Sequence, residues 1–132
     1  MFGWFDSKAS KAREIRQLNR DAPVVIEAAR QSYRSELVQA IARLTDLRLQ
    51  EAKQHCAEDR KCMERAVAHF RTLHRQSRSK HEHVGLTAYT LIIIYLRALI
   101  IGEACVAARS EIDAFLDEWR HTFGEDDGTF VP

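Results

Sequence analysis

Residues 86–108 read LTAYTLIIIYLRALIIGEACVAA, a stretch that is apolar on every side of a helix and carries only two charges, Arg97 and Glu103. A helix that is apolar all round is either buried inside a protein or placed in a membrane. The fold must therefore cover this stretch from more than one direction. Other parts of the chain, or a second copy of it, have to supply that cover.

The two charges decide between protein and membrane. The stretch is long enough to span, because about 20 apolar residues cross a bilayer. Arg97 lies near its centre, however, and each charge costs roughly 2.5–3.5 kcal/mol at mid-bilayer. That cost about cancels the gain from nine Leu and Ile residues at roughly 0.5 kcal/mol each. The sequence therefore favours burial within protein.

The composition predicts one all-α domain. The 132 residues are 45% hydrophobic and 30% charged, which is typical of a folded chain. Only two prolines and five glycines occur, whereas a sheet protein needs turn residues at short intervals. We expect no strands.

The helical pattern predicts a long antiparallel hairpin with a short N-terminal helix. The expected parts are a basic helix over 7–20, a long amphipathic helix over 23–76, an apolar-then-amphipathic helix over 80–122 and a loose acidic tail over 124–132. Asp21 and Pro23 predict a helix start, and Ser79 with Glu82 forms a capping box. Asp59 lies on the apolar stripe of the long helix, so a break is expected there if anywhere.

Arg97 and Glu103 also point to self-association. They are six residues apart, about 240° around a helix, so each needs a partner from another segment or another chain. A hairpin cannot cover every side of residues 86–108. We therefore expect a homo-oligomer of the four-helix-bundle type, with a dimer favoured. The expected interface consists of Tyr89, Ile93, Leu96, Arg97, Ile100 and Glu103.

The charge is unevenly distributed along the chain. Residues 1–80 carry a net charge of +7 and residues 81–132 a net charge of −6, while the whole chain carries only +1. Opposite halves of this kind suit a chain that folds back on itself, although a drift of sign along solvated faces explains the pattern equally well. The balanced total argues against a nucleic acid partner.

The three cysteines indicate reduced thiols and a cytoplasmic location. An odd count without a secretory signal favours free thiols. Cys56 and Cys62 cannot bridge within one intact helix, because six residues place them about 9 Å apart along its axis. We expect both to be small core residues.

Histidines supply weak candidates for a metal site. Their spacing does not match that of a zinc helix, and the one Glu-x-x-His motif lacks the second that a di-iron bundle needs. We therefore predict no metal, no cofactor and no catalytic residue. The residues that a metal site would use are His69, His74, His81, His83, Glu118 and His121.

The N-terminus offers a second kind of function. Phe2, Trp4 and Phe5 precede a basic segment, an arrangement typical of an interfacial membrane anchor. Packing of these rings onto the bundle is the other interpretation. The leading prediction is a non-enzymatic helical interaction or assembly module. The alternatives are a peripheral membrane protein and a metal-binding helical bundle.

Overall fold

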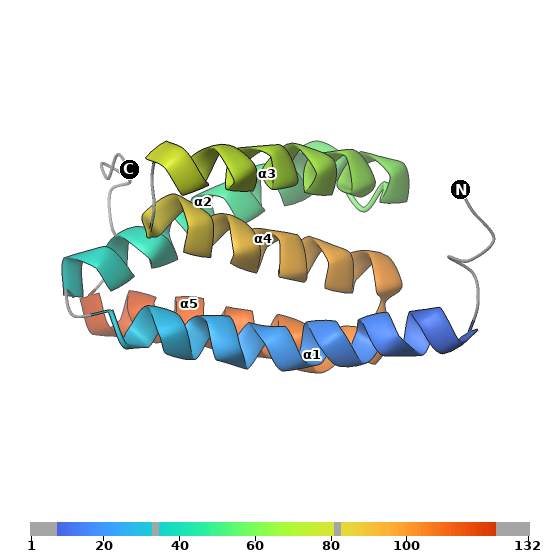
Figure 1. Cartoon of the computed structure of the whole chain (residues 1–132), viewed down its shortest axis with the longest axis horizontal. Helices are drawn as coiled ribbons and strands as arrows, with labels where there is room; N and C mark the ends of the chain where they lie inside the picture. Colours follow the sequence, from blue (N-terminus) through green and yellow to red (C-terminus); the bar gives the residue numbers. More distant parts are fainter. Residues whose placement is uncertain (1–7, 33–34, 81–82, 124–132) are drawn as a thin grey trace.

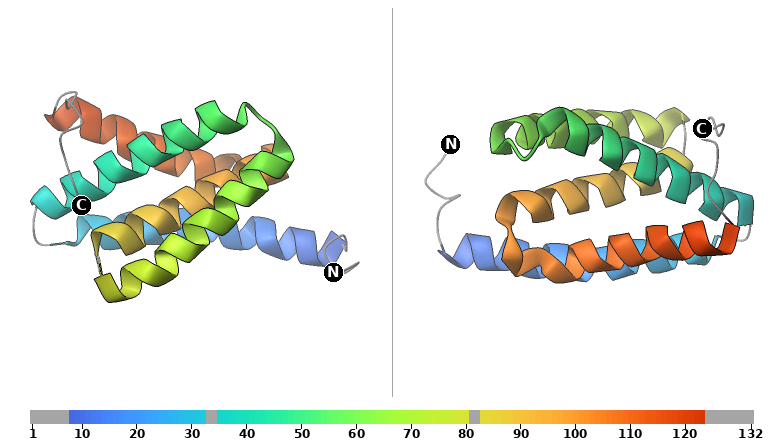
Figure 2. Two further views of the ribbon diagram at one scale, coloured as in Figure 1. Left: turned by 90° about the horizontal axis from the view of Figure 1, so that it is seen from above. Right: turned by 180° about the vertical axis from the view of Figure 1, so that it is seen from behind.

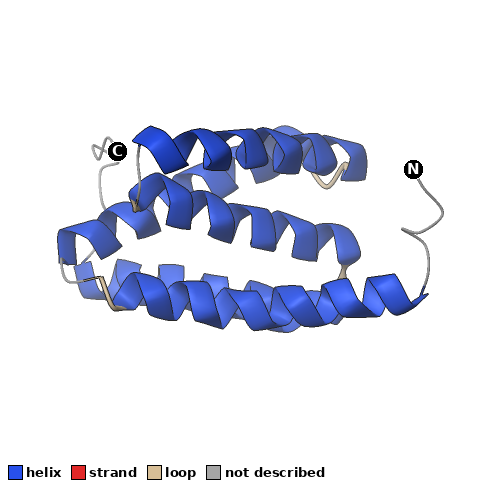
Figure 3. Ribbon diagram, in the orientation of Figure 1, coloured by secondary structure: helices blue, strands red, loops and turns tan. Residues whose placement is uncertain are grey.

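The computed structural model describes residues 8–32, 35–80 and 83–123 (Figure 1). Within these residues the chain is all helical and contains no strand, so the all-α prediction is confirmed (Figure 3). The elements are α1 (Lys8–Arg30), α2 (Ser35–Cys56), α3 (Arg60–Lys80), α4 (Val84–Ile101), the short 3-10 helix η2 (Glu103–Cys105) and α5 (Val106–Phe123).

The apolar helix α4 is the centre of the fold. It lies between α2 and α3 on one side and α1 and α5 on the other, and packs against all four (Figures 1 and 2). Leu91, Ile92 and Leu96 are fully buried within the single chain. The composition of α4 follows from this position, because a helix with neighbours on several sides has little need of a polar face.

The predicted helix over 23–76 is wrong, because the chain divides it into parts of three helices. Helix α1 passes through Pro23 and continues to Arg30. The buried face of α1 keeps the same phase on both sides of the proline, through Leu18, Ala22 and Ile26. Continuous packing of this face offsets the hydrogen bond that a proline removes from a helix interior.

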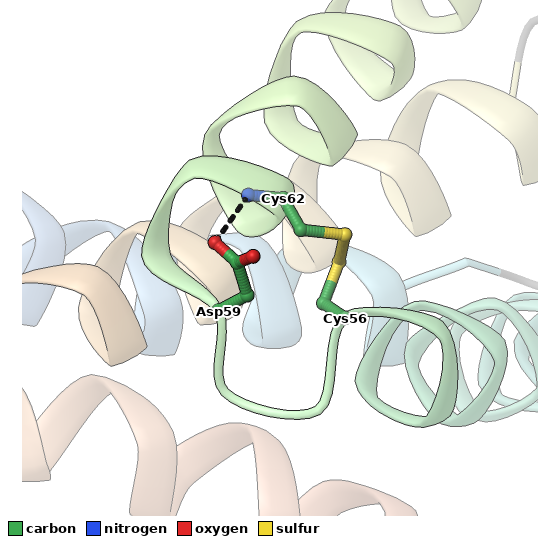
Figure 4. The surroundings of a disulfide bond; sticks show 3 residues. All are labelled: Cys56, Asp59 and Cys62. Carbon is green, nitrogen blue, oxygen red and sulfur yellow. Dashed lines mark hydrogen bonds between the residues drawn. A yellow bond between two sulfur atoms is a disulfide. The ribbon is translucent and has the colours of Figure 1, made fainter.

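The predicted long helix is also interrupted at residues 57–59. Asp59 was the expected position of any break. Ala57 and Glu58 adopt φ angles of 46° and 69°, which end α2 in the left-handed region. Asp59 then begins α3, since its Oδ1 accepts a hydrogen bond from the backbone N–H of Cys62 at 3.1 Å (Figure 4). A carboxylate in this position satisfies an amide that lacks a helical partner.

This turn joins two cysteines that were expected to be apart. Cys56 and Cys62 form a disulfide, with their Cα atoms 5.2 Å apart (Figure 4). The prediction that these two cysteines cannot form a bond is therefore wrong, because it assumed an intact helix, and the pair is not reduced as the odd cysteine count suggested. Cys105 is the free cysteine, and it is buried. The odd cysteine count consequently says nothing about the compartment.

The second half of the chain also differs from the predicted helix over 80–122. Helix α3 continues to Lys80, so the backbone of Ser79 belongs to α3, whereas Glu82, the other residue of the predicted capping box, lies outside the described residues. Helix α4 begins at Val84, and the cap residue His83 makes no side-chain cap hydrogen bond. Gly102, with φ of 97°, ends α4 before the chain re-enters a helix at η2. Glycine adopts this backbone conformation without steric cost.

Ion pairs connect the helices around this core. Arg97 of α4 pairs with Glu14 of α1, so its partner comes from another segment of the same chain. Glu103 is exposed and needs no buried partner. At the other end of the molecule, Arg30 pairs with Glu118 at 2.5 Å. Neither Arg97 nor Glu103 therefore requires a partner from a second chain.

Candidate functional site

A groove of about 560 Å³ lies between α2 and α3. The two helices diverge from the turn at residues 57–59, and α4 lies beneath the space between them (Figure 2). The Cys56–Cys62 disulfide is part of the groove lining, at the point where the helices meet. The volume falls within the range of about 300–1,000 Å³ that is usual for ligand sites.

The apolar part of the lining comes from α2, α3 and α4 and consists of Ala52, Ala66, Phe70, Leu73 and Tyr89. Phe70 is buried, and its ring contacts the half-buried ring of Tyr89 with centroids 6.1 Å apart. Ala52 and Ala66 project only a methyl group from the facing helices. The groove is hollow partly because these two side chains are too small to fill it.

The polar lining carries more positive than negative charge and consists of Arg48, Glu51, His55, Arg65 and His69. Arg48 donates two hydrogen bonds to Glu51, at 2.9 and 3.0 Å, so this pair is neutral overall. Arg65 is exposed and has no ion pair or hydrogen bond among the residues that the structure describes. Its guanidinium is available to an anionic ligand.

The rest of α3 reinforces this polarity. Residues 60–80 contain seven Lys or Arg residues and one acidic residue, Glu64. Glu64 lies 3.6 Å from Arg60, within α3 itself. An anion that approaches the groove therefore meets an excess of positive charge.

The structure does not bring the candidate metal ligands together. Across residues 8–32, 35–80 and 83–123, no group of three His, Cys, Asp or Glu side chains could hold an ion. Glu118 is paired with Arg30, and the Nδ1 atom of His121 lies 3.1 Å from the carbonyl oxygen of Asp117. Within the described region, the candidate histidines are His69 on the groove rim, His74 later in α3 and His83 before α4. His81 lies outside the described residues.

The six predicted interface residues have separate environments. Leu96 is fully buried in the core, so it offers no surface to a partner. Tyr89 lines the groove, while Ile93 and Ile100 are half-buried and pack against the core. Arg97 is held by Glu14 as described above, and Glu103 lies exposed in η2.

The described region contains one helix that could span a membrane by length and composition. It is α4, with a mean hydropathy of 2.0 over Val84–Ile101 and 44% of its residues buried within the chain. The core helix of a soluble protein meets the same criterion. The aromatic residues of the proposed anchor, Phe2, Trp4 and Phe5, lie outside the described residues.

Two buried reactive groups lie elsewhere and are kept neutral. Burial, and then the charge of Glu14, raises the pKa of the Cys105 thiol, which makes a poor nucleophile of it. Burial and the adjacent carboxylate of Asp113 raise the pKa of Tyr95. The Tyr95 hydroxyl donates to Asp113 at 3.4 Å. We interpret the contact between Tyr95 and Asp113 as structural and not as catalytic.

Comparison of the chain with protein-family models, curated proteins and solved structures found no match.

Most of the groove was not anticipated from the sequence. Tyr89 was expected at an interface and His69 at a metal site. Ala52 and Ala66 were expected on the apolar stripe of one long helix, and Arg65 was not singled out. These residues face one another only because the chain turns at residues 57–59. The available signal was Asp59 on an otherwise apolar stripe, since such a residue commonly caps a helix.

Proposed function

We propose that this protein is a non-enzymatic interaction module that binds an acidic, partly apolar peptide segment of another protein in the groove between α2 and α3. The proposal rests on one observation, the combination of an apolar lining with the unpaired cation Arg65. An apolar side chain of the partner would pack against Phe70 and Tyr89. A neighbouring carboxylate would pair with Arg65.

The size of the groove favours binding of a short peptide segment and not contact with a large flat protein surface. About 560 Å³ accommodates one or two large side chains together with the backbone that carries them. Binding energy at protein interfaces concentrates in a few anchors of this kind, surrounded by polar contacts that exclude water. Partner segments commonly enter grooves between helices in this way.

The proposal can be tested with anilinonaphthalene sulfonate, an anionic aromatic probe that matches both features of the groove. We expect saturable binding with one site per chain. Ala66→Leu fills the groove and should weaken binding at least tenfold. Arg65→Gln removes the free cation and should weaken it several-fold. Ala68→Leu is the matched control, because Ala68 is exposed on the same helix and does not line the groove.

Retained near-ultraviolet circular dichroism in each variant would ensure that the probe reports the groove and not a loosened core. Equal binding by wild type, Ala66→Leu and Arg65→Gln would overturn the proposal. Light scattering on the same samples measures the oligomeric state. A dimer that dissociates on Ile93→Ser substitution, without any probe binding, would assign the function to self-association through α4.

A further inference from the structure

One face of α4 stays partly open, although this helix packs against four others. Helices α1 and α3 lie on either side of the face and, within the described residues, do not contact each other (Figure 1). Leu86, Ile93 and Ile100 occur at every seventh position of α4 and are half-buried. Residues seven apart lie on one side of a helix, so these three form an apolar column, which we call the α4 column.

Contacts at its edges place the α4 column between α1 and α3. Tyr89 and Arg97 precede and follow Ile93 by four residues, so they lie about 40° to either side of it. The ring of Tyr89 contacts Phe70 of α3, and Arg97 pairs with Glu14 of α1. Ile93 therefore faces the space between the two helices. A molecule that packs there meets no unpaired charge on Arg97.

We propose that a second copy of the chain packs on the α4 column. In this dimer the two α4 helices lie parallel, related by a two-fold axis that runs along them. Each α3 then lies opposite α1 of the other copy, and Arg71 of each copy pairs with Asp21 of the other. The inference does not depend on the proposed groove, which lies on the side of α3 that faces α2.

Arg71 lies on the α3 edge of this face. His69 and Leu73 line the groove toward α2, and Arg71 is two residues from each, about 200° around the helix. It therefore lies on the side of α3 away from α2. It follows Phe70, which contacts Tyr89, so it lies level with that part of α4. Arg71 is exposed and has no ion pair or hydrogen bond within the described part of the chain.

Asp21 lies on the α1 edge of the same face. Asn19 bonds to η2 and α5, and Asp21 is about 200° from it, on the side of α1 away from α5. Glu14, seven residues earlier on this side, pairs with Arg97. Helices α1 and α4 run in opposite directions, so Asp21 lies level with Thr90, seven residues before Arg97 (Figure 1).

These opposite charges favour a second copy as the occupant. Asp21 accepts a hydrogen bond from Gln17 at 2.8 Å but forms no ion pair with any described residue. Arg71 and Asp21 lie at nearly the same level of α4, on opposite edges of the face. A two-fold axis along α4 keeps the level and exchanges the edges, so each Arg71 faces an Asp21. An anionic membrane or an acidic partner would instead be repelled by the carboxylate edge.

The face is large enough for a dimer. The 18 residues of α4 rise about 27 Å, and three helices side by side at spacings of about 8–10 Å are about 25 Å wide. Such a face covers about 700 Å², close to the roughly 800 Å² per partner of a standard stable interface. The net charge of +1 causes little repulsion between copies.

Charge exchange tests this arrangement in the full-length chain by sedimentation velocity. We expect a dimer for the wild type. Arg71→Glu brings two carboxylates together and Asp21→Arg two guanidinium groups, so each variant alone should dimerise at least tenfold more weakly. An equimolar mixture of the two variants should recover the wild-type affinity, because unlike chains restore both ion pairs. Arg65→Glu, on the groove side of α3, is the matched control and should dimerise normally.

Two further variants test the apolar column and its direction. Ile93→Ser should weaken the dimer at least tenfold, whereas Leu47→Ser, which alters an exposed apolar residue of α2, should not. A short bismaleimide should join Leu86→Cys chains to one another, because parallel helices bring the two positions together. Cys105 is buried and the other cysteines are bonded, so this labelling is selective.

Three results would overturn the inference. The first is a wild type that remains monomeric at high micromolar concentration. The second is a mixture of Arg71→Glu and Asp21→Arg that stays as weakly associated as either variant alone, although near-ultraviolet circular dichroism shows both to be folded. The third is Leu86→Cys that becomes linked only to Ile100→Cys in mixed samples, because the two α4 helices would then be antiparallel.

Discussion

Asn19 in the middle of α1 caps the start of α5. Its Oδ1 accepts a hydrogen bond from the backbone N–H of Ala108 at 3.0 Å, and its Nδ2 donates to the carbonyl oxygen of Ala104 at 3.2 Å. One amide thus satisfies a donor of the new helix and an acceptor of η2. Helix α4 ends at Gly102, and Asn19 of α1 stabilises the junction between α4 and α5 through these two hydrogen bonds.

Replacing this amide should destabilise the protein. We expect Asn19→Ala to lower the free energy of unfolding by about 1–2 kcal/mol, because it removes a cap and a second hydrogen bond. Asn19→Asp keeps the acceptor and should cost less. Urea denaturation measures both. Gln17→Ala, which removes only a contact with Asp21 in the same helix, should change stability little. Equal losses for Asn19→Ala and Gln17→Ala would contradict the capping role.

The turn between α2 and α3 should become more stable with glycine. Glu58 is exposed and has a φ of 69°, a conformation that costs an ordinary side chain about 1 kcal/mol. Glu58→Gly should therefore raise the free energy of unfolding by about 0.5–1 kcal/mol. Thermal unfolding measures the effect, with Glu64→Gly in α3 as a control that should be destabilising. A lower melting temperature for Glu58→Gly would argue against this turn geometry.

Reduction of the Cys56–Cys62 disulfide should loosen the same turn. Closing a loop of this length in the unfolded chain corresponds to about 2 kcal/mol of stability in the chain-entropy model. We expect a reductant to lower the free energy of unfolding by about that amount and to weaken probe binding in the groove. Cys62→Ser should resemble the reduced protein and should not respond to reductant. If reductant also left the free energy of unfolding of the wild type unchanged, the disulfide would contribute nothing to stability.

Alkaline pH should destabilise the core around Tyr95. The folded protein raises the pKa of this phenol above its ordinary value of 10.0, because burial and Asp113 disfavour the phenolate. Above pH 10 the unfolded chain therefore releases a proton that the folded chain retains, and stability falls as pH rises. Tyr95→Phe should flatten this decline between pH 10 and 11. Denaturant unfolding at several pH values in this range measures the effect. Equal losses of stability in wild type and Tyr95→Phe would contradict the role of Tyr95.

The sequence predicted the structure best for the apolar stretch, because its composition alone indicates burial. The apolar character of the stretch that begins at Leu86 indicated a helix covered from several sides, and α4 (Val84–Ile101) does pack against four other helices of the chain. Helix boundaries were less accessible. Ala57 and Glu58 have ordinary helical propensities, so their left-handed conformations follow from the packing of α2 and α3 on α4. Gly102 could have predicted the end of α4, but the apolar pattern continues on both sides of it and suggested one helix.

The groove could not be predicted, because it depends on how two helices diverge. Ala52 and Ala66 are common helix residues, and each reads as an ordinary core position when taken alone. They form one surface only after the chain reverses at Asp59. Arg65 likewise resembles any solvated arginine until Ala66 and Phe70 are seen to line the hollow beside it.

The position of α1 has a consequence for how the protein is made. Helix α1 packs mainly against α4 and α5, and the pairs Glu14–Arg97 and Asn19–Ala108 join residues 83 and 89 positions apart. Because α1 is synthesised before α4 and α5, it cannot make these contacts until both later helices have left the ribosome. A nascent chain stopped before α5 would expose α4, and any truncated product would be a substrate for chaperones or proteases.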